Sequence, residues 1–476
     1  MQTGKRIFKN TLFLIVGKGF GDLATFLFLV YFARVFGISI FGQYALAMSL
    51  GGFLSILVSL GLNTLVIREI SKDKNNDARY IGNMLATQCV LAILCWGLIG
   101  IFILLSNFDN DAGLIILIIG TYQVLYKLTE LIHSRFKAHE DMEYSALLEI
   151  YHKIVILIFG SLCIILVKDP VITLLVYPVS AASMFLIGII ISNHKYGNPG
   201  FKINFSFIRE LLSKAMPFLI LTILVQFYDR IGIILLTTFQ GDEATGIYAA
   251  SDRFLIAIIS GIGLFGSALF PVMSKFAHES RQKLTVTYER SVRIIMVTVL
   301  PTSTFLYLFS DQIILFVYGE AFSESASIFR ILSWAILPIG LCVILANLLV
   351  AIDQQKNIAK TELLIFSGFL IACIILIPLY SYTGLAYAKL VTSSVLCLAF
   401  SWQLSKTFRQ NLLVRTIKSP LIASLTTIFV FNLMSDQNLW LSFPIALLTC
   451  IITLFLTGGI KSHDLSYIKD NLLEKR

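Results

Sequence analysis

Long apolar runs separated by short polar segments make up most of the chain. A membrane-spanning helix needs about 20 mainly apolar residues, and runs of that length predict about 14 spans. The predicted spans are residues 11–35, 41–67, 81–105, 112–132, 146–167, 172–193, 213–238, 246–272, 291–310, 327–351, 362–380, 384–404, 419–435 and 439–459. The split between the fifth and sixth spans depends on Lys-Asp-Pro at 168–170. The pattern therefore predicts an all-α integral membrane protein.

Composition agrees with this class and excludes several others. Apolar residues make up 57% of the 476 residues and charged residues only 14%, whereas a soluble protein carries about 25% charged residues. Disordered and collagen-like chains are excluded by the high hydrophobicity and by the low Gly and Pro content. The seven cysteines lie in apolar stretches and form no CxxC pair, so we expect neither a zinc site nor a disulfide framework.

The net charge of +9 would suggest a nucleic-acid partner in a soluble protein. Here the basic residues lie in short loops between apolar runs, which is how membrane proteins set their orientation, and no nucleic-acid partner is expected. With the N-terminus in the cytoplasm, the predicted inner segments carry 29 of the 37 Lys and Arg residues, and the outer segments carry Arg34, Lys168 and Arg330. This alternation predicts an even number of spans and two cytoplasmic termini. The first span lacks a small-residue cleavage site and is expected to be retained.

The longest inner connection, residues 194–212, lies near the middle of the chain. Its Asn-Pro-Gly turn and the amphipathic sequence FSFIRELL indicate an interfacial linker, with an ordinary loop before a frayed helix as the alternative. We therefore predict an N-terminal lobe of six spans (1–193), a C-terminal lobe of six spans (213–404), and a last helix pair with a cytoplasmic tail (405–476).

A short repeat supports two related lobes. Gly37, Gly42 and Tyr44 follow the first span, and Gly241, Gly246 and Tyr248 follow the seventh, each at an offset of 204 residues. Together with the matching order of spans, the repeat indicates two parallel six-helix lobes. This is the architecture of a transporter whose lobes rock against each other.

Residues 33–71 resemble the opening of Wzx-type O-antigen and polysaccharide flippases, in which a turn with Gly, Phe and Tyr precedes a helix, a Gly-Leu pair and an Arg-Glu-Ile end. The residues that carry the resemblance are Gly37, Phe41, Gly42, Tyr44, Gly61, Leu62, Arg68, Glu69 and Ile70. Residues 237–254, 270–276 and 318–334 resemble the second half of that family. Ile38 departs from the pattern, because many members have Pro after the glycine.

The resemblance implies the fold of the multidrug, oligosaccharidyl-lipid and polysaccharide exporter superfamily and a place in the cell inner membrane. It also implies the transfer of undecaprenyl-pyrophosphate-linked oligosaccharide, as in O-antigen and lipopolysaccharide biosynthesis or that of another surface polysaccharide, from the cytoplasmic to the outer leaflet by alternating access. The implied partners are the lipid-linked oligosaccharide, membrane lipid, a polysaccharide polymerase and a chain-length regulator. No cofactor is implied.

Ionisable residues inside spans are costly and mark candidate functional sites. A basic lining for a pyrophosphate would draw on five embedded cations, which are Lys18, Lys153, Arg230, Arg253 and Lys389. Candidate sites for a coupling proton or cation are the acids Asp22, Glu149 and Asp229.

The structural alternative is that these charges neutralise one another. Lys18 and Asp22, and likewise Glu149 and Lys153, are spaced i, i+4 on one helix. Asp229 with Arg253, and Arg230 with Asp252, can pair across the hairpin of the seventh and eighth spans. Lys389 has no partner near it in sequence, which makes it the clearest candidate for a substrate-binding cation.

Catalytic and nucleotide-binding motifs are missing from the sequence. It contains no GxxxxGK[ST], HExxH or GxSxG motif, so we expect neither an ATPase, another enzyme nor a metal site. Transport of the substrate would then be driven by an ion gradient or by consumption of the substrate on the outer side. A cation-coupled multidrug exporter of the same fold stays open as an alternative. A membrane polymerase or ligase is disfavoured, because it would need a substantial outer loop.

Overall fold

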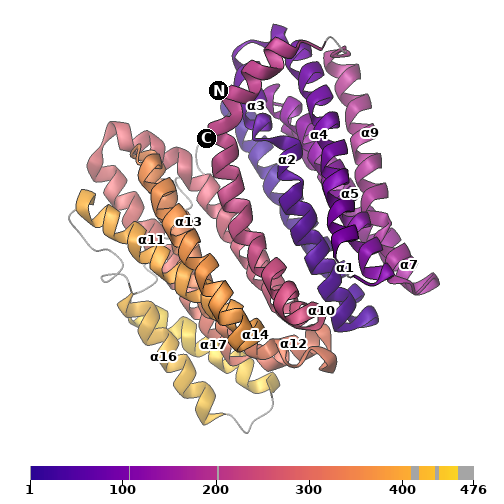
Figure 1. The fold of residues 1–476 in the computed structure, drawn as a ribbon. Coiled ribbons are helices and arrows are strands. Elements are labelled where there is room, and N and C mark those ends of the chain that lie inside the picture. Colours follow the sequence, from indigo (N-terminus) through magenta and orange to yellow (C-terminus); the bar gives the residue numbers. More distant parts are fainter. Residues whose placement is uncertain (1, 107, 201–202, 409–416, 435–438, 459–476) are drawn as a thin grey trace. The chain divides into compact units, whose positions relative to one another are not determined.

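The apolar runs fold as long helices in a computed structural model of the chain (Figure 1). The structure describes all residues except 1, 107, 201–202, 409–416, 435–438 and 459–476, and also leaves the side chains of residues 2–18, 214–222, 224–225, 229 and 439–443 undescribed. The described residues form helices and connecting turns with no strand among them. This confirms the prediction of an all-α chain.

Helices cover most of the predicted spans, although the predicted span 41–67 is divided among three helices. The helices are α1 (Gln2–Leu54), α2 (Ile56–Ser59), α3 (Leu62–Lys72), α4 (Asp77–Leu105), α5 (Asn110–Ala138), α6 (Met142–Val155), α7 (Ser161–Leu166), α8 (Pro170–Leu174), α9 (Val176–Tyr196), α10 (Phe205–Glu279), α11 (Arg281–Leu308), α12 (Ser310–Tyr318), α13 (Ser325–Ala351), α14 (Gln355–Phe408), α16 (Lys418–Leu433) and α17 (Leu439–Leu456). A π-helical turn, Ile156–Gly160, joins α6 to α7.

Nine helical runs within the described part of the chain are long and apolar enough to cross a membrane. Three of these runs are 54 residues long, and they contain residues with non-helical dihedrals at Gly37, Gly241 and Ser381. The first run is also interrupted between α2 and α3, where Leu60 and Gly61 have positive φ. Two further apolar helices, Lys418–Leu433 and Pro444–Leu456, are shorter. The chain is a multi-pass membrane protein, and the total of 14 spans stays a prediction.

The predicted break between the fifth and sixth spans is confirmed and has a local cause. Helix α7 ends at Leu166, and α8 begins at Pro170. The Asp169 carboxylate accepts a hydrogen bond from the backbone N–H of Ile172 at 2.8 Å. An acceptor at the N-cap followed by Pro at the first helical position is a strong start signal for a helix.

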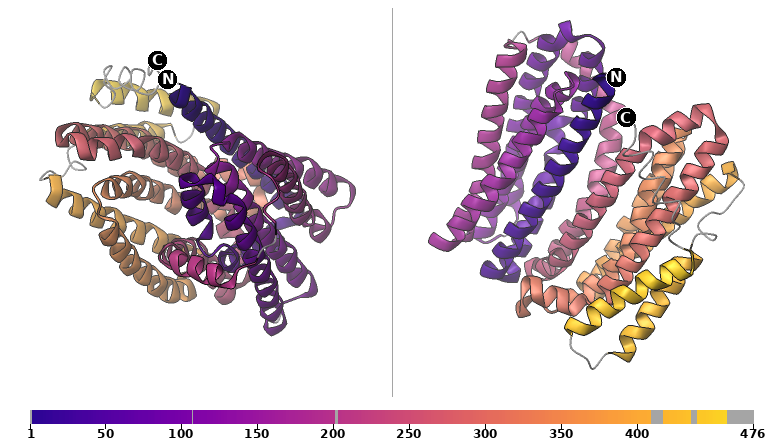
Figure 2. Two further views of the ribbon diagram at one scale, coloured as in Figure 1. Left: turned by 90° about the horizontal axis from the view of Figure 1, so that it is seen from above. Right: turned by 180° about the vertical axis from the view of Figure 1, so that it is seen from behind.

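The chain divides into two compact units, Met1–Ala249 (unit 1) and Ala250–Arg476 (unit 2). Within each unit the helices lie alongside one another, as Figures 1 and 2 show for α1, α4, α5 and α9 of unit 1 and for α11, α13 and α14 of unit 2. The lobe boundaries proposed from the sequence stay a prediction.

The amphipathic segment after residue 204 is the start of α10 and packs onto unit 1. Phe207 and Leu211 are buried in a cluster with residues of α3 and α4, among them Leu65 and Met84. The guanidinium of Arg79 lies 4.1 Å from the centre of the Phe207 ring. The apolar face of this segment is therefore covered by protein.

The two copies of the glycine repeat adopt the same backbone conformation. Gly37 has φ 82° and ψ −177°, and Gly241 has φ 83° and ψ −175°. This region is essentially open to glycine alone. The tyrosines of the repeat, Tyr44 and Tyr248, are both buried. The bends that separate the first span from the second and the seventh from the eighth are thus built in the same way.

The two hairpins also cross each other within unit 1. A Cβ added to Gly42 would lie 1.8 Å from the carbonyl oxygen of Asp242, and a Cβ added to Gly246 would lie 2.1 Å from the carbonyl oxygen of Ile38. Gln43 Nε2 donates to Asp242 Oδ2 at 3.0 Å. The 204-residue offset relates Gly42 to Gly246 and Ile38 to Asp242, so the two glycine–carbonyl contacts are equivalent and the crossing is reciprocal. Only glycine at these two positions lets the hairpins approach so closely.

Candidate functional site

Arg230 is held against the second span in unit 1. Its guanidinium Nη1 donates to the carbonyl oxygen of Met48 at 2.6 Å, and its Nε donates to Gln226 Oε1 at 3.1 Å. A Cβ added to Gly52 would lie 2.0 Å from Nη1. The missing side chain at Gly52 therefore creates the space that the guanidinium occupies.

Glu149 and Lys153 do not form the ion pair considered from their spacing on α6. Glu149 Oε1 accepts a hydrogen bond from the Tyr126 hydroxyl at 2.7 Å and lies 3.7 Å from His133 Nδ1. Both of these partners belong to α5. The neighbouring helix therefore supplies the contacts of Glu149, because its side chains point at the same face of α6.

Lys153 instead lies along α1. Its Cγ lies 3.1 Å from where a Cβ on Gly21 would stand, so the absence of a side chain at Gly21 lets the lysine stem pass. The residue is partly exposed, and it forms neither an ion pair nor a hydrogen bond with the side chains that the structure describes. Lys153 thus lies within the span Met142–Leu166 with no acidic partner among the described side chains.

Lys389, the cation without a sequence neighbour of opposite charge, has a partner in unit 2. Its Nζ donates to Asp252 Oδ1 at 2.7 Å, and the side chains are 15% and 7% exposed. Lys389 has no partner near it in sequence, but a carboxylate 137 residues away lies beside it, and its role in substrate binding stays a prediction. This contact also gives Asp252 a partner other than Arg230.

The remaining candidates are distributed over the two units. Asp22 is partly buried on α1 and has an interaction partner. Arg253 belongs to unit 2, is partly buried, and acts electrostatically on the buried Tyr318. The side chains of Lys18 and Asp229 lie outside the described residues. Of the cations predicted from the sequence, Lys153 and Arg230 therefore lie in unit 1, and Arg253 and Lys389 lie in unit 2.

Sequence reasoning missed a cluster of aromatic side chains inside unit 1. The hydroxyls of Tyr44 and Tyr177 lie 3.1 Å apart, and the rings of Tyr122 and Tyr177 meet edge to face with centres 5.0 Å apart. The positive charge of Arg230 interacts electrostatically with the Tyr122 side chain. Tyrosine at helical spacing on one face of α5 was the only signal in the sequence, and it equally indicates an ordinary core.

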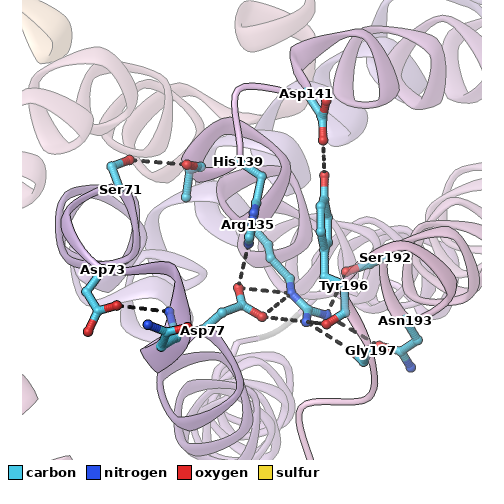
Figure 3. Close-up of polar contacts among 12 residues, drawn as sticks. Ser71, Asp73, Asp77, Arg135, His139, Asp141, Ser192, Asn193, Tyr196 and Gly197 are labelled. Carbon is cyan, nitrogen blue, oxygen red and sulfur yellow. Dashed lines mark hydrogen bonds and ion pairs between the residues drawn. The ribbon is translucent and has the colours of Figure 1, made fainter.

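A second feature missed from the sequence is a buried ion pair at the predicted inner end of unit 1 (Figure 3). Arg135 Nε donates to Asp77 Oδ2 at 2.9 Å, Nη1 donates to Ser192 Oγ at 2.9 Å, and Nη2 donates to the carbonyl oxygen of Gly197 at 3.0 Å. Arg135 is 1% exposed. Its guanidinium joins the start of α4, the end of α5 and the end of α9.

Aromatic and charged side chains extend this cluster. The rings of His139 and Tyr196 stack with centres 4.0 Å apart, and the Tyr196 hydroxyl donates to Asp141 Oδ2 at 2.6 Å, as Figure 3 shows. Lys195 Nζ lies 2.8 Å from the same Asp141 oxygen. The loop charges that we assigned to membrane orientation thus include a packed structural cluster.

None of the described residues forms a group of three or more His, Cys, Asp or Glu side chains that could hold a metal ion. The polar groups described above are cations, tyrosines and single acids instead. Such an arrangement can bind an anion or a proton.

Two family models each match more than half of the chain. The model "Polysaccharide biosynthesis protein" matches residues 7–277, and the model "Lipid II flippase MurJ" matches residues 179–456. The "Probable low-salt glycan biosynthesis flippase Agl15" of Haloferax volcanii is 22% identical over 81% of this chain and 81% of its own length. The "Putative O-antigen transporter" of Shigella dysenteriae is 26% identical over 58% of this chain and 70% of its own length.

Solved structures show the same fold. The lipid II flippase MurJ in an inward closed conformation is similar over 96% of this chain and 100% of its own, with a TM-score of 0.81 and 16% identity. An inward-facing multidrug-resistance transporter of the MATE family and the MOP superfamily is similar over 85% of this chain and 94% of its own, with a TM-score of 0.59 and 15% identity.

Proposed function

Because this chain belongs to the polysaccharide biosynthesis protein family, we propose that it transfers an undecaprenyl-pyrophosphate-linked oligosaccharide from the inner to the outer leaflet of the membrane. The chain is a glycan flippase, a transporter rather than an enzyme. The substrate, the direction of transfer and the residues that bind the headgroup are parts of this proposal.

The main support for an anionic substrate is the environment of Lys153, a cation on a span. A charged side chain at membrane depth is costly, and neutralisation by a partner reduces that cost. Lys153 is partly buried on a span and lacks an acidic partner among the described side chains. A pyrophosphate oxygen would supply the missing charge. Arg230, whose planar guanidinium is suited to phosphate oxygens, is the second cation of unit 1 in this proposal.

The proposed path is alternating access by two six-helix lobes with a final helix pair. Support comes from the bends at Gly37, Gly241 and Ser381, since each lies within a 54-residue run, which is more than twice the length of about 20 residues that one span needs. Counted in this way, the nine runs become 12 spans, and α16 and α17 bring the total to 14. The inner membrane, two cytoplasmic termini, and a polymerase and chain-length regulator as partners belong to the same proposal.

A cation-coupled multidrug exporter is the alternative with the same fold. The similarity to the MATE structure is smaller than that to MurJ in both coverage and TM-score, although at these identities either similarity speaks only for the fold. The relatives named as a glycan flippase and an O-antigen transporter favour the glycan substrate.

Transport by the purified protein in proteoliposomes tests the proposal. Fluorescent lipid-linked oligosaccharide is expected to move across the membrane without being lengthened or cleaved. Lys153→Gln should reduce the initial rate at least tenfold, and Lys153→Arg, which keeps the positive charge, should restore most of it. Lys72→Gln, at an exposed lysine that contacts Glu69 at 3.3 Å, is the control. Equal rates for Lys153→Gln and Lys72→Gln would exclude Lys153 as a headgroup ligand, and failure of the wild type to move this lipid would exclude the substrate.

A further inference from the structure

Two histidines inside unit 1 have unused hydrogen-bonding capacity. His133 on α5 and His152 on α6 are 6% and 0% exposed. The Nε2 atom of each ring is buried and has no hydrogen-bond partner in the described part of the chain. Leaving a buried polar atom unsatisfied costs about 1–3 kcal/mol, so each such atom needs an explanation.

The surroundings of His152 leave one ring nitrogen unsatisfied in either neutral tautomer. Ser180 Oγ lies 2.7 Å from His152 Nδ1 and 3.2 Å from the His152 carbonyl oxygen. When the Ser180 hydroxyl donates to the carbonyl, Nδ1 must donate to Ser180 and Nε2 is a bare acceptor. When the hydroxyl donates to Nδ1, Nε2 carries a proton without an acceptor. In the first arrangement a lone pair is available to take up a proton.

Among the side chains that the structure describes, no Lys or Arg contacts Glu149, which lies one turn before His152 on α6. Its contacts are the Tyr126 hydroxyl at 2.7 Å and His133 Nδ1 at 3.7 Å, and a neutral imidazole does not compensate a carboxylate charge. The Tyr122 and Tyr126 rings lie 5.6 and 5.9 Å from the His152 ring. Glu149 and the two histidines therefore share one aromatic, membrane-embedded setting. Acids and histidines arranged in this way are typical of proton pathways in transporters.

We propose that Glu149, His133 and His152 form a proton-binding site through which proton influx drives export, an inference that depends on the proposed flippase function. A proton from the outer side binds the Glu149 carboxylate and gives the neutral acid. The Nε2 lone pairs of the histidines are alternative positions for the same proton. Release to the inner side restores the carboxylate, so one proton enters and one leaves, and no other reactant is consumed.

Other ionisable groups lie around this site, and their charges affect how readily it binds a proton. The basic and acidic neighbours are Lys153 on α6 and Glu130 and Lys137 on α5, while Arg230 on α10 acts on Tyr122. Glu130 differs from Glu149 because both of its oxygens lie 3.0 Å from Lys127 Nζ. The phenols around the site are Tyr44, Tyr122, Tyr126 and Tyr177.

Infrared spectroscopy tests the site without any transport substrate. The purified full-length protein in lipid is titrated with acid, and the carbonyl stretch of a protonated carboxylic acid is followed. A band present in the wild type and in Glu130→Gln but lost in Glu149→Gln is expected. A band of unchanged size in Glu149→Gln would overturn the site. Glu149→Asp keeps a carboxyl group and should retain the band.

Proteoliposome transport tests the coupling. An inward proton gradient should raise wild-type and Glu130→Gln export several-fold, and the ratio of rates with and without the gradient should fall to unity in Glu149→Gln. Wild-type export that is indifferent to the gradient would overturn the coupling, whether or not the variants fold. If the wild type does not move the labelled lipid but Glu149→Gln loses the infrared band, the proton site is supported and the proposed substrate is wrong.

Discussion

Removing the negative charge of Asp77 should destabilise unit 1 far more than its position near a loop suggests. Arg135 is 1% exposed and donates to both Asp77 oxygens, at 2.9 and 3.1 Å from Nε. In Asp77→Asn the guanidinium stays buried and loses its counter-charge. Breaking a buried pair from one side costs about 3–5 kcal/mol, a large part of a typical total stability of about 5–15 kcal/mol.

The control substitution is Asp73→Asn, four residues earlier. Asp73 is exposed and accepts hydrogen bonds from the Asn75 backbone N–H at 3.0 Å and from Asn76 Nδ2 at 2.7 Å. An asparagine can keep this local turn, so the change should stay within about 0.5 kcal/mol. Thermal unfolding in detergent, followed by loss of the monodisperse peak in size-exclusion chromatography, compares the two variants.

A double variant separates the charge effect from a packing effect. Asp77→Leu with Arg135→Met removes both charges, and replacing a buried pair by apolar residues is often neutral or stabilising. We expect the double variant to recover most of the stability lost in Asp77→Asn. If Asp77→Asn melts together with Asp73→Asn, the guanidinium of Arg135 does not depend on Asp77, and the reasoning from its burial is refuted.

Two further predictions concern the hairpin crossing and the pair in unit 2. Gly246→Ala places a Cβ 2.1 Å from the Ile38 carbonyl oxygen, whereas ordinary contacts are 3.4–4 Å. The two hairpins must then move apart, which should lower the free energy of unfolding by about 1–3 kcal/mol and reduce the transport rate. Gly97→Ala, with open space at its Cβ, should do neither, and equal melting temperatures would contradict the crossing. Lys389→Gln leaves Asp252 without its cation and should lower the melting temperature, whereas the double variant Lys389→Met with Asp252→Leu should recover it. If the double variant is stable but no longer exports, Lys389 binds substrate.

The sequence by itself determined the membrane class, the positions of the helices and the repeated bends. In a bilayer every backbone N–H and C=O must be satisfied within the segment, so each long apolar run has to be helical. The glycines at 37 and 241 also follow from local chemistry, because their positive φ excludes most side chains. Such features depend on one segment at a time and can be predicted from it.

Only the tertiary structure decided which partner each charge has. Spacing along α6 brings Glu149 and Lys153 to one face, yet α5 supplies Tyr126 and His133 to the carboxylate. Asp252 reaches Lys389 across 137 residues of sequence. Ion pairs and hydrogen bonds act over a few ångströms, whereas the distance between two helices depends on how all of them pack. A periodic sequence therefore predicts the face on which a charge lies, but not the group that lies opposite to it.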